Sequence, residues 1–447
     1  MIAPKDVIAA AEQEWRGLVA EHLPHAAPES IWRFNRPSSS RADGTQGWKL
    51  HVSATSRSAA DVLRRVAPVL AEMSVLWKAP GSMVDIRRLN SGLFYGYTQI
   101  GKVITAYAGD ADRARSLASR LDVELRGVLG PRVPFDRRLR PGSVVHYRYG
   151  AFHPVSQVEV DGVRVDALIA PDGQLRPDRR AEAVPGWVED LFPAAPPEPP
   201  GGPLARTYLA YESIAQRGKG GTYLALDLRS SPAERVVLKE GRRHGETDFD
   251  GRDGRDRVAH EARVLAELSA AGARVPALLD SFAWEENHYI VMEHLDGPAL
   301  LELPGERERV RAAAGVAEVV AGIHAAGWAW RDCKVTNLIA APDGVRAIDL
   351  EGACPISDPD PWPWGSPGHV PPEWPFTTLV VEQDLYALGA VLRQLLDGIS
   401  VPAEVSRLVT ALLADDPAER PPAADVHEAL SRCHGRPHVR SCSRVRA

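Results

Sequence analysis

Cysteine is scarce in this chain, with 4 residues in 447, at positions 333, 354, 433 and 442. Their spacing matches neither a metal site nor a disulfide framework, which favours a reducing, cytoplasmic location. The chain also lacks any run of about 18 apolar residues, so we expect no membrane-spanning helix and no membrane partner. Residues 1–20 lack the apolar core of a signal peptide. The net charge of −6 gives no reason to expect a nucleic-acid partner.

Composition and one proline-rich stretch predict two globular domains. Hydrophobic residues make up 44% and charged residues 25% of the chain, which is usual for folded protein. Residues 193–203 contain six prolines and two glycines, cannot form a helix or an inner strand, and predict a stiff linker. We therefore expect an α+β domain over residues 1–192, a second domain over 204–435 and a tail over 436–447. The charged, glycine-containing stretch 242–257 predicts a mobile loop.

Residues 328–352 contain a spacing of polar residues that is typical of protein-kinase-like phosphotransferases. Asp332 precedes Lys334 by two positions and Asn337 by five, and Asp349 follows a short apolar strand. Phosphoryl transfer depends on positioning and charge neutralisation. In this pattern Asp332 orients the attacking hydroxyl, Lys334 neutralises phosphate charge, and Asn337 and Asp349 hold Mg²⁺. ATP or GTP is the expected co-substrate.

Further motifs of a nucleotide site surround this segment in the order of a two-lobed protein kinase fold. Taken singly, each motif also has a purely structural explanation: a hairpin turn, a solvated charge, a surface ion pair or a buried strand. Together they predict a kinase, in which Lys239 pairs with Glu261 and reaches the phosphates. The same pattern predicts a structural ion pair between Glu373 and Arg420. The predicted nucleotide-binding residues are Gly218, Gly220, Gly221, Lys239, Glu261, Glu293 and Leu295.

Two positions depart from the usual kinase pattern. Trp330 stands where the family usually has histidine before the arginine, and the metal motif reads Asp349-Leu350-Glu351 instead of Asp-Phe-Gly. These departures put the usual regulatory packing in question but keep the catalytic carboxylates. A catalytically inactive pseudokinase is the alternative.

The upstream block carries a second set of candidate residues. The stretch Trp48 to Ala54 alternates strictly between apolar and polar residues, so a strand there places Lys49, His51 and Ser53 on one face. A polar face of this kind is ordinary where it meets water. A helix is expected over residues 59–73, followed by a short strand that ends in Lys78. Further basic residues suit a phosphorylated ligand, and we single out Arg87, Arg88, Lys102 and Arg148.

Residues 47–55 and 140–150 closely resemble the N-terminal domain of class III lanthipeptide synthetases. Those enzymes join a phospho-Ser/Thr lyase, a kinase and a cyclase, and the order of lyase then kinase matches nearly all of this chain. The Lys49-x-His51 pair also resembles bacterial effector phosphothreonine lyases. No cyclase-sized domain is expected after the kinase. The motif Cys433-His434-Gly435, similar to a zinc-ligand motif of those cyclases, is taken as chance.

The resemblance implies a bifunctional dehydratase of a ribosomal precursor peptide with a leader. The kinase phosphorylates Ser or Thr, and the lyase expels phosphate to leave dehydroalanine or dehydrobutyrine. Lys78 is then the base, His51 donates a proton to the departing phosphate, and Lys49 stabilises the enolate-like charge. The four basic residues named above are candidates for holding phosphate. Ring closure then needs a separate protein, such as a cyclase.

Two other functions remain open from the sequence. The chain is a plain Ser/Thr protein kinase whose N-terminal domain only binds peptide, or it is a scaffold with a degenerate kinase core. Intact Lys239, Asp332, Asn337 and Asp349 argue against the scaffold.

Overall fold

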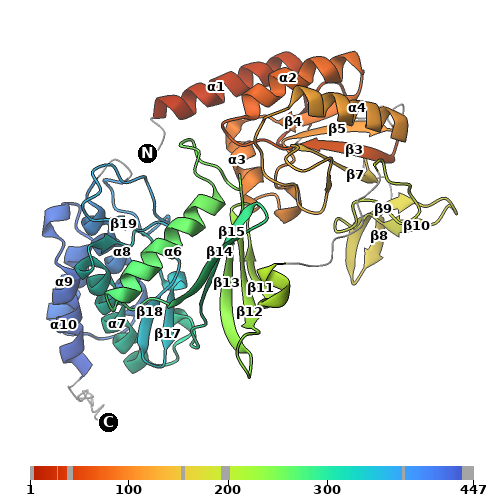
Figure 1. The fold of residues 1–447 in the computed structure, drawn as a ribbon. Helices are drawn as coiled ribbons and strands as arrows, with labels where there is room; N and C mark the ends of the chain where they lie inside the picture. The colour runs from red at the N-terminus through yellow and green to blue at the C-terminus, as the bar shows by residue number, and fades with distance from the viewer. Residues whose placement is uncertain are drawn as a thin grey trace, which may run out of the picture.

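The described residues form two α+β bodies, one on each side of the proline-rich stretch in the sequence (Figure 1). The computed structural model describes residues 5–27, 29–37, 44–152, 157–192, 202–374 and 378–434. Most of the predicted linker, residues 193–201, and the tail from residue 435 lie outside the described residues. None of the described helices is both long and apolar enough to cross a membrane.

A seven-stranded sheet forms the centre of the N-terminal body, and every neighbouring pair in it is antiparallel. In spatial order its strands are β1 (His25–Ala26), β2 (Trp32–Phe34), β4 (Leu76–Pro80), β5 (Ile104–Gly109), β3 (Gln46–Val52), β7 (Val145–Ala151) and β6 (Arg137–Arg138). A smaller antiparallel sheet follows, with the order β10 (Leu175–Pro177), β9 (Val163–Ile169) and β8 (Gln157–Val160).

Helices cover one face of the large sheet. They are α1 (Lys5–His22), α2 (Ala59–Glu72), α3 (Met83–Ser91) and α4 (Ala111–Glu124). In Figure 1, α1, α2 and α4 lie above strands β3, β4 and β5. The apolar half of the predicted alternation, Trp48, Leu50 and Val52, is buried in the same core as Val62, Leu63 and Val66 of α2. The opposite face of β3, which bears Lys49 and His51, is therefore turned away from the helices.

The second body begins with a five-stranded antiparallel sheet. Its order is β11 (Tyr208–Gln216), β12 (Gly220–Asp227), β13 (Glu234–Gly241), β15 (Asn287–Glu293) and β14 (Leu278–Trp284). Pro203, which we expected within an irregular linker, instead begins the short helix α5 (Pro203–Arg206). A proline at the first helical position is compatible with a helix, because that N–H has no intrahelical partner.

Helix α6 (Gly254–Ala270) packs against this sheet and carries Glu261. Its N-terminus is capped by Asp253, which accepts hydrogen bonds from the N–H groups of Arg255 and Asp256, while Asp256 accepts one from Asp253 in return. The prediction of a mobile loop over residues 242–257 is therefore wrong for residues 254–257, which are helical. The missed signal is the Asp-x-x-Asp capping box.

The remaining residues form a mainly helical lobe. Its helices are α7 (Glu306–Ala325), α8 (Val380–Leu395), α9 (Ala403–Leu412) and α10 (Ala423–His434), and its short strands are β16 (Trp328–Ala329), β17 (Leu338–Ala341), β18 (Gly344–Ala347) and β19 (Cys354–Pro355). The predicted ion pair is present here: Arg420 donates to both carboxylate oxygens of Glu373, at 2.6 and 3.0 Å.

The two bodies contact each other at the C-terminal end of α3 and at β6. The Gly218 N–H donates to the Ser91 carbonyl oxygen at 2.9 Å. Arg138 of β6 pairs with Glu286, beside strand β15, at 2.7 Å. A Cβ atom at Gly218 would lie 1.7 Å from the Asn90 carbonyl oxygen, so only glycine permits this approach.

Two candidate active sites

The first site is a cavity of about 670 Å³ between the five-stranded sheet and the helical lobe. Its lining contains most of the predicted nucleotide and metal residues, namely Gly220, Gly221, Lys239, Glu261, Glu293, Leu295, Lys334, Asn337 and Asp349. Gly218 is not among the lining residues, because it faces the N-terminal body instead. The segments that surround the cavity come from β12, β13, α6, β15 and the loop before β17, which are far apart in the chain.

Lys239 is the centre of an ion-pair network in this cavity. Its Nζ lies 2.6 Å from a Glu261 oxygen and 2.7 Å from an Asp349 oxygen, so the predicted Lys239–Glu261 pair is present. Burial disfavours the ammonium form, but Asp349 and Glu261 raise the pKa of Lys239 well above its usual value. Lys239 therefore stays charged and available for phosphate.

Asp332 is held by three neighbours, one of which the sequence analysis did not single out. The Lys334 Nζ donates to one Asp332 oxygen at 2.7 Å, and the Asn337 side chain donates to the same oxygen at 2.9 Å. The Ser366 hydroxyl donates to the other oxygen at 2.7 Å. Ser366 thus marks where a hydroxyl meets this carboxylate, which is the geometry required of an acceptor hydroxyl.

The two departures from the kinase pattern have visible structural consequences. Trp330 is fully buried, and its indole N–H donates to the Asp349 carbonyl oxygen at 3.2 Å. It therefore supports the backbone of the metal motif. Glu351 is also buried, and its carboxylate lies with those of Glu261 and Asp349, all within 4.8 Å of one another.

The donor set of this cavity suits Mg²⁺ and a nucleotide. Mg²⁺ prefers carboxylate oxygens together with phosphate oxygens, and Asp349 and the Asn337 amide both line the cavity. One Glu351 oxygen is buried without a hydrogen-bond partner, so an oxygen ligand is available beside them.

The second site lies on the face of the large sheet that is turned away from the helices. The register aligns His51 of β3 with Thr105 of β5, and Thr105 with Lys78 of β4. Because residues that are paired across antiparallel strands point to the same face, the three side chains form one row. The next row pairs Lys49 with Arg148 of β7 and with Tyr107 of β5. Lys49, His51 and Arg148 are at most 7% exposed, so this polar face is not a solvated one.

Two carboxylates that the sequence analysis missed organise these cations. His51 Nδ1 lies 2.5 Å from one oxygen of Asp136, and Lys102 Nζ lies 3.3 Å from the other. Arg148 pairs with Asp178 at 2.5 Å. Asp136 and Asp178 lie in loops outside any periodic segment, so no sequence pattern points to them.

Burial and mutual repulsion change the proton affinity of this cluster. Burial, followed by the charges of Arg180 and Lys102, lowers the pKa of Lys78 to about 8. Burial, followed by Arg180 and Arg148, holds the pKa of Lys49 well below its usual value. Burial also lowers the pKa of His51 to about 3, although Asp136 acts in the opposite direction. The cluster therefore contains lysines that reach the neutral form near physiological pH.

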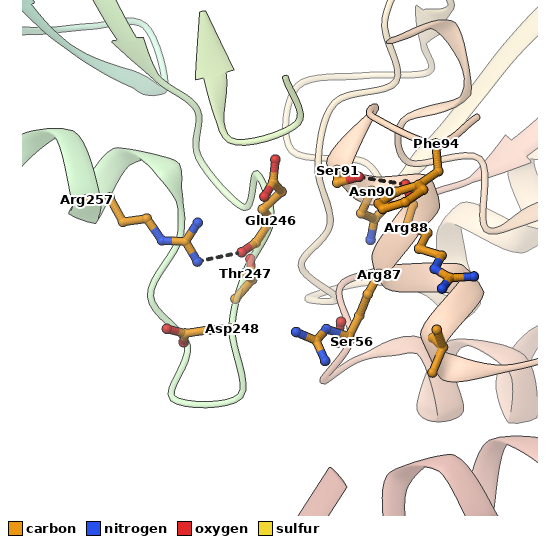
Figure 2. A pocket seen from close by; sticks show the side chains of 11 residues that line it. Ser56, Arg87, Arg88, Asn90, Ser91, Phe94, Glu246, Thr247, Asp248 and Arg257 are labelled. Atoms are coloured by element: carbon orange, nitrogen blue, oxygen red, sulfur yellow. Dashed lines mark hydrogen bonds between the residues drawn. The ribbon is translucent and has the colours of Figure 1, made fainter. Parts of the chain in front are cut away.

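Arg87 and Arg88 are not brought to this cluster. Both are exposed residues of α3 and line a different cavity, of about 350 Å³, between the two bodies. Figure 2 shows Arg87 extending toward the wall that bears Thr247, Asp248 and Arg257, whereas the Arg88 guanidinium points away from that wall. Of the four residues predicted to hold phosphate in the lyase, only Lys102 and Arg148 lie with the Lys49–His51 cluster.

Comparisons with known proteins divide the chain in the same way. Residues 18–201 match the family model described as RamC, N-terminal domain. Residues 211–404 match the model of the protein kinase domain. This chain joins a RamC-type N-terminal domain to a protein kinase domain. The predicted order of domains is therefore confirmed.

Curated relatives extend this result. The chain is 31% identical over 415 residues to a probable SapB synthase of Streptomyces coelicolor, a match that covers 88% of this chain and 44% of the relative. It is 29% identical over 194 residues to the serine/threonine-protein kinase AfsK of the same organism, over 41% of this chain and 24% of AfsK. Serine/threonine-protein kinase C of Synechocystis is 26% identical over 212 residues, 44% of this chain and 40% of the relative. The chain thus spans less than half the length of these relatives.

Proposed function

We propose that the protein dehydrates Ser or Thr of a ribosomal precursor peptide in two steps, phosphorylation in the kinase domain and phosphate elimination in the RamC-type domain. The observation that carries this proposal is the row of His51, Thr105 and Lys78 on one buried face, with Lys49 and Arg148 in the next row. The match to a probable SapB synthase supports a synthetic role on a peptide. The proposed location is the cytoplasm.

In the kinase domain, Asp332 orients the substrate hydroxyl and accepts its proton, in the place that Ser366 marks. Lys334 neutralises the transferred phosphoryl group, and Lys239 holds the nucleotide phosphates while Glu261 positions it. Asn337 and Asp349 hold Mg²⁺, which supplies charge neutralisation on the phosphates of ATP or GTP.

In the RamC-type domain, neutral Lys78 removes the Cα proton of the phosphorylated residue. The electron pair of that C–H bond forms the Cα=Cβ double bond, the Cβ–O bond breaks, and phosphate leaves. Lys49 stabilises the negative charge that develops on the substrate carbonyl oxygen. Lys102 and Arg148 attract the phosphate by their positive charge, since Lys102 shares Asp136 with His51 and Arg148 is paired with Lys49 across the strands.

His51 acts as proton donor only when phosphate is bound. In the ligand-free site its pKa of about 3 keeps the ring neutral. A bound phosphate brings negative charge that raises this pKa, because an adjacent opposite charge favours the imidazolium form. Asp136 holds Nδ1 and thereby directs Nε2 of His51 toward the leaving group.

The experiment uses the full chain with ATP, Mg²⁺ and a Ser/Thr-containing precursor peptide encoded beside the gene, and measures peptide mass. Loss of water is the expected result. Lys78→Met should leave phosphorylated peptide, with elimination reduced by roughly 10²-fold or more, because a positioned base contributes at least that much. Asp332→Asn should give no product from the unmodified peptide but should still eliminate phosphate from a synthetic phosphoserine version.

A matched control is Arg140→Met, which removes an exposed cation that pairs with Asp122 away from the row. It should behave as the unmodified chain does. If the unmodified chain phosphorylates the peptide but never eliminates phosphate, even from the phosphoserine peptide, the protein is a plain Ser/Thr kinase whose N-terminal domain only binds peptide.

A further inference from the structure

Position 351 carries a buried carboxylate where the kinase pattern has glycine. Glu351 is 1% exposed and lies at the nucleotide cavity. Its carboxylate and those of Glu261 and Asp349 all lie within 4.8 Å of one another. Glu261 and Glu351 are buried and Asp349 is partly exposed, and carboxylates at such distances repel one another strongly unless cations separate them.

Two lysines supply the cations in this cluster, and one of them comes from the glycine-rich loop. Lys239 contacts Glu261 and Asp349 closely and lies 3.7 Å from Glu351. Lys219, between Gly218 and Gly220, pairs directly with the Glu351 Oε1 oxygen. Two ammonium groups face three carboxylates, so the cluster keeps one excess negative charge.

Two oxygens of this cluster are buried without a hydrogen-bond partner, Glu261 Oε2 and Glu351 Oε2, and the first lies 2.6 Å from the Lys239 Nζ. The Glu351 Oε2 atom is buried and accepts no hydrogen bond, and the Lys239 Nζ lies 3.7 Å from it. A buried carboxylate oxygen without a hydrogen bond is costly, and here it belongs to a residue that lines the cavity together with Asp349 and Asn337. This second observation points to a ligand with positive charge.

A bound nucleotide would remove the partners of Glu351. Phosphate oxygens attract the ammonium groups of Lys219 and Lys239, and the loop that bears Lys219 is the one that covers phosphates in this fold. A buried Glu351 without Lys219 would be destabilising by several kcal/mol. A divalent cation that also contacts the phosphates removes this penalty, because Mg²⁺ is usually held by one or two carboxylates together with phosphate oxygens.

We propose that Glu351 is a third cation-binding carboxylate of the kinase site, and that Lys219 is its counter-ion, exchanged for a divalent cation when nucleotide binds. Lys219 then moves from Glu351 to the phosphates. The glycine-rich loop is thereby fixed to the metal motif before nucleotide binding and to the phosphates afterwards. This inference depends only on the kinase domain and not on the elimination step.

The test measures Mn²⁺ binding to the full chain by electron paramagnetic resonance, with and without a non-hydrolysable ATP analogue. With the analogue, Glu351→Gln should weaken Mn²⁺ binding by about tenfold, since one charged ligand is lost. Without the analogue, Lys219→Met should strengthen Mn²⁺ binding by about tenfold, because Glu351 is then free to bind the ion. The double variant should lose that gain.

A matched control is Glu246→Gln, which changes a neighbouring carboxylate whose Oε1 accepts a hydrogen bond from the Lys219 N–H at 3.1 Å. The amide oxygen keeps that bond, so Mn²⁺ binding should not change. If Glu351→Gln fails to fold by circular dichroism, Glu351→Gly replaces it, because it restores the kinase pattern without a buried charge. Unchanged Mn²⁺ binding in the analogue complex of the folded Glu351 variant would overturn the proposal, as would the absence of any gain in Lys219→Met. Either failure would leave the dehydration proposal untouched, since no peptide is involved.

Discussion

Lys78 lies in aromatic surroundings that explain how a lysine can act as a base. Its Nζ is 4.2 Å from the centre of the Trp32 ring and 5.8 Å from that of Phe34. No carboxylate pairs with it among the ion pairs of the described residues, and burial with nearby Arg180 and Lys102 lowers its pKa to about 8. The residue paired with Lys78 in the row is Thr105, which carries no charge.

The elimination rate should therefore depend on pH with a defined sign. The neutral, active form of Lys78 becomes more abundant as pH rises toward about 8. We expect kcat for a phosphoserine peptide to rise about tenfold per pH unit on the acidic side, as Lys78 loses its proton, and to fall on the alkaline side, where His51 of the phosphate complex loses its proton. Lys102, whose pKa is also about 8, loses its charge over the same range, so KM should increase above pH 8. Single-turnover rates across this range check the prediction, and a flat kcat profile would exclude Lys78 as the base.

Sequence reasoning reached the residues of this site unequally. The alternation of polar and apolar residues around Lys49 and His51 was enough to place them on one face, because strand geometry alone determines it. It could not show that this face is buried, since burial depends on segments such as residues 130–136 that pack over it later. The roles of Asp136 and Asp178 could not be predicted, because residues in loops follow no periodic sequence pattern.

At the scale of elements, α3 explains why two predicted residues lie elsewhere. Met83, Ile86 and Leu89 are buried, and they recur every three residues along one side of the helix. Arg87 and Arg88 therefore point away from the core of their own domain. The spacing of these apolar residues is visible in the sequence and predicts which side of the helix is exposed. The basic character of Arg87 and Arg88 does not predict which site they join.

Helix α6 gives a prediction of its own, because its capped N-terminus holds the helix that positions Glu261. Asp253→Ala removes the side chain that accepts hydrogen bonds from Arg255 and Asp256. The free energy of unfolding should fall by about 1–2 kcal/mol, and nucleotide affinity should fall with it. Chemical denaturation and nucleotide titration measure the two effects. Arg255→Ala, an exposed change in the same turn, should alter stability by less than about 0.5 kcal/mol, and an equal loss in both variants would contradict the capping role.

At the scale of the whole molecule, the outer side of the glycine-rich loop rests on the RamC-type domain. The Gly218 N–H bonds to Ser91, and the Asn90 side chain bonds in turn to Ala54 and to Gly101, both within its own domain. Gly101 precedes Lys102 of the elimination site. The adjacent residues Asn90 and Ser91 thus link the glycine-rich loop to the backbone beside the elimination site.

Gly218→Ala should separate the two domains at this point, because the added Cβ would meet the Asn90 carbonyl oxygen. We expect slower dehydration of unmodified peptide, retained elimination from phosphoserine peptide, and faster hydrogen exchange over residues 90–102. The matched control is Gly322→Ala within α7, where a Cβ meets no atom within 4 Å. That change should stabilise the helix by roughly 1 kcal/mol. Unaltered exchange in Gly218→Ala would show that the contact is unimportant in solution.

The position of Asn90 has a consequence for how such a protein can diverge. The Asn90 side chain holds the backbone at Ala54 and Gly101, near His51 and Lys102, while the carbonyl oxygen of the next residue, Ser91, accepts a hydrogen bond from the Gly218 N–H of the glycine-rich loop. A substitution at this contact that alters the nucleotide site would also alter the elimination site. We therefore expect the two domains to coevolve. Replacing one domain by that of a remote homologue would require the residues of this contact, Asn90 and Ser91, to be transferred as well.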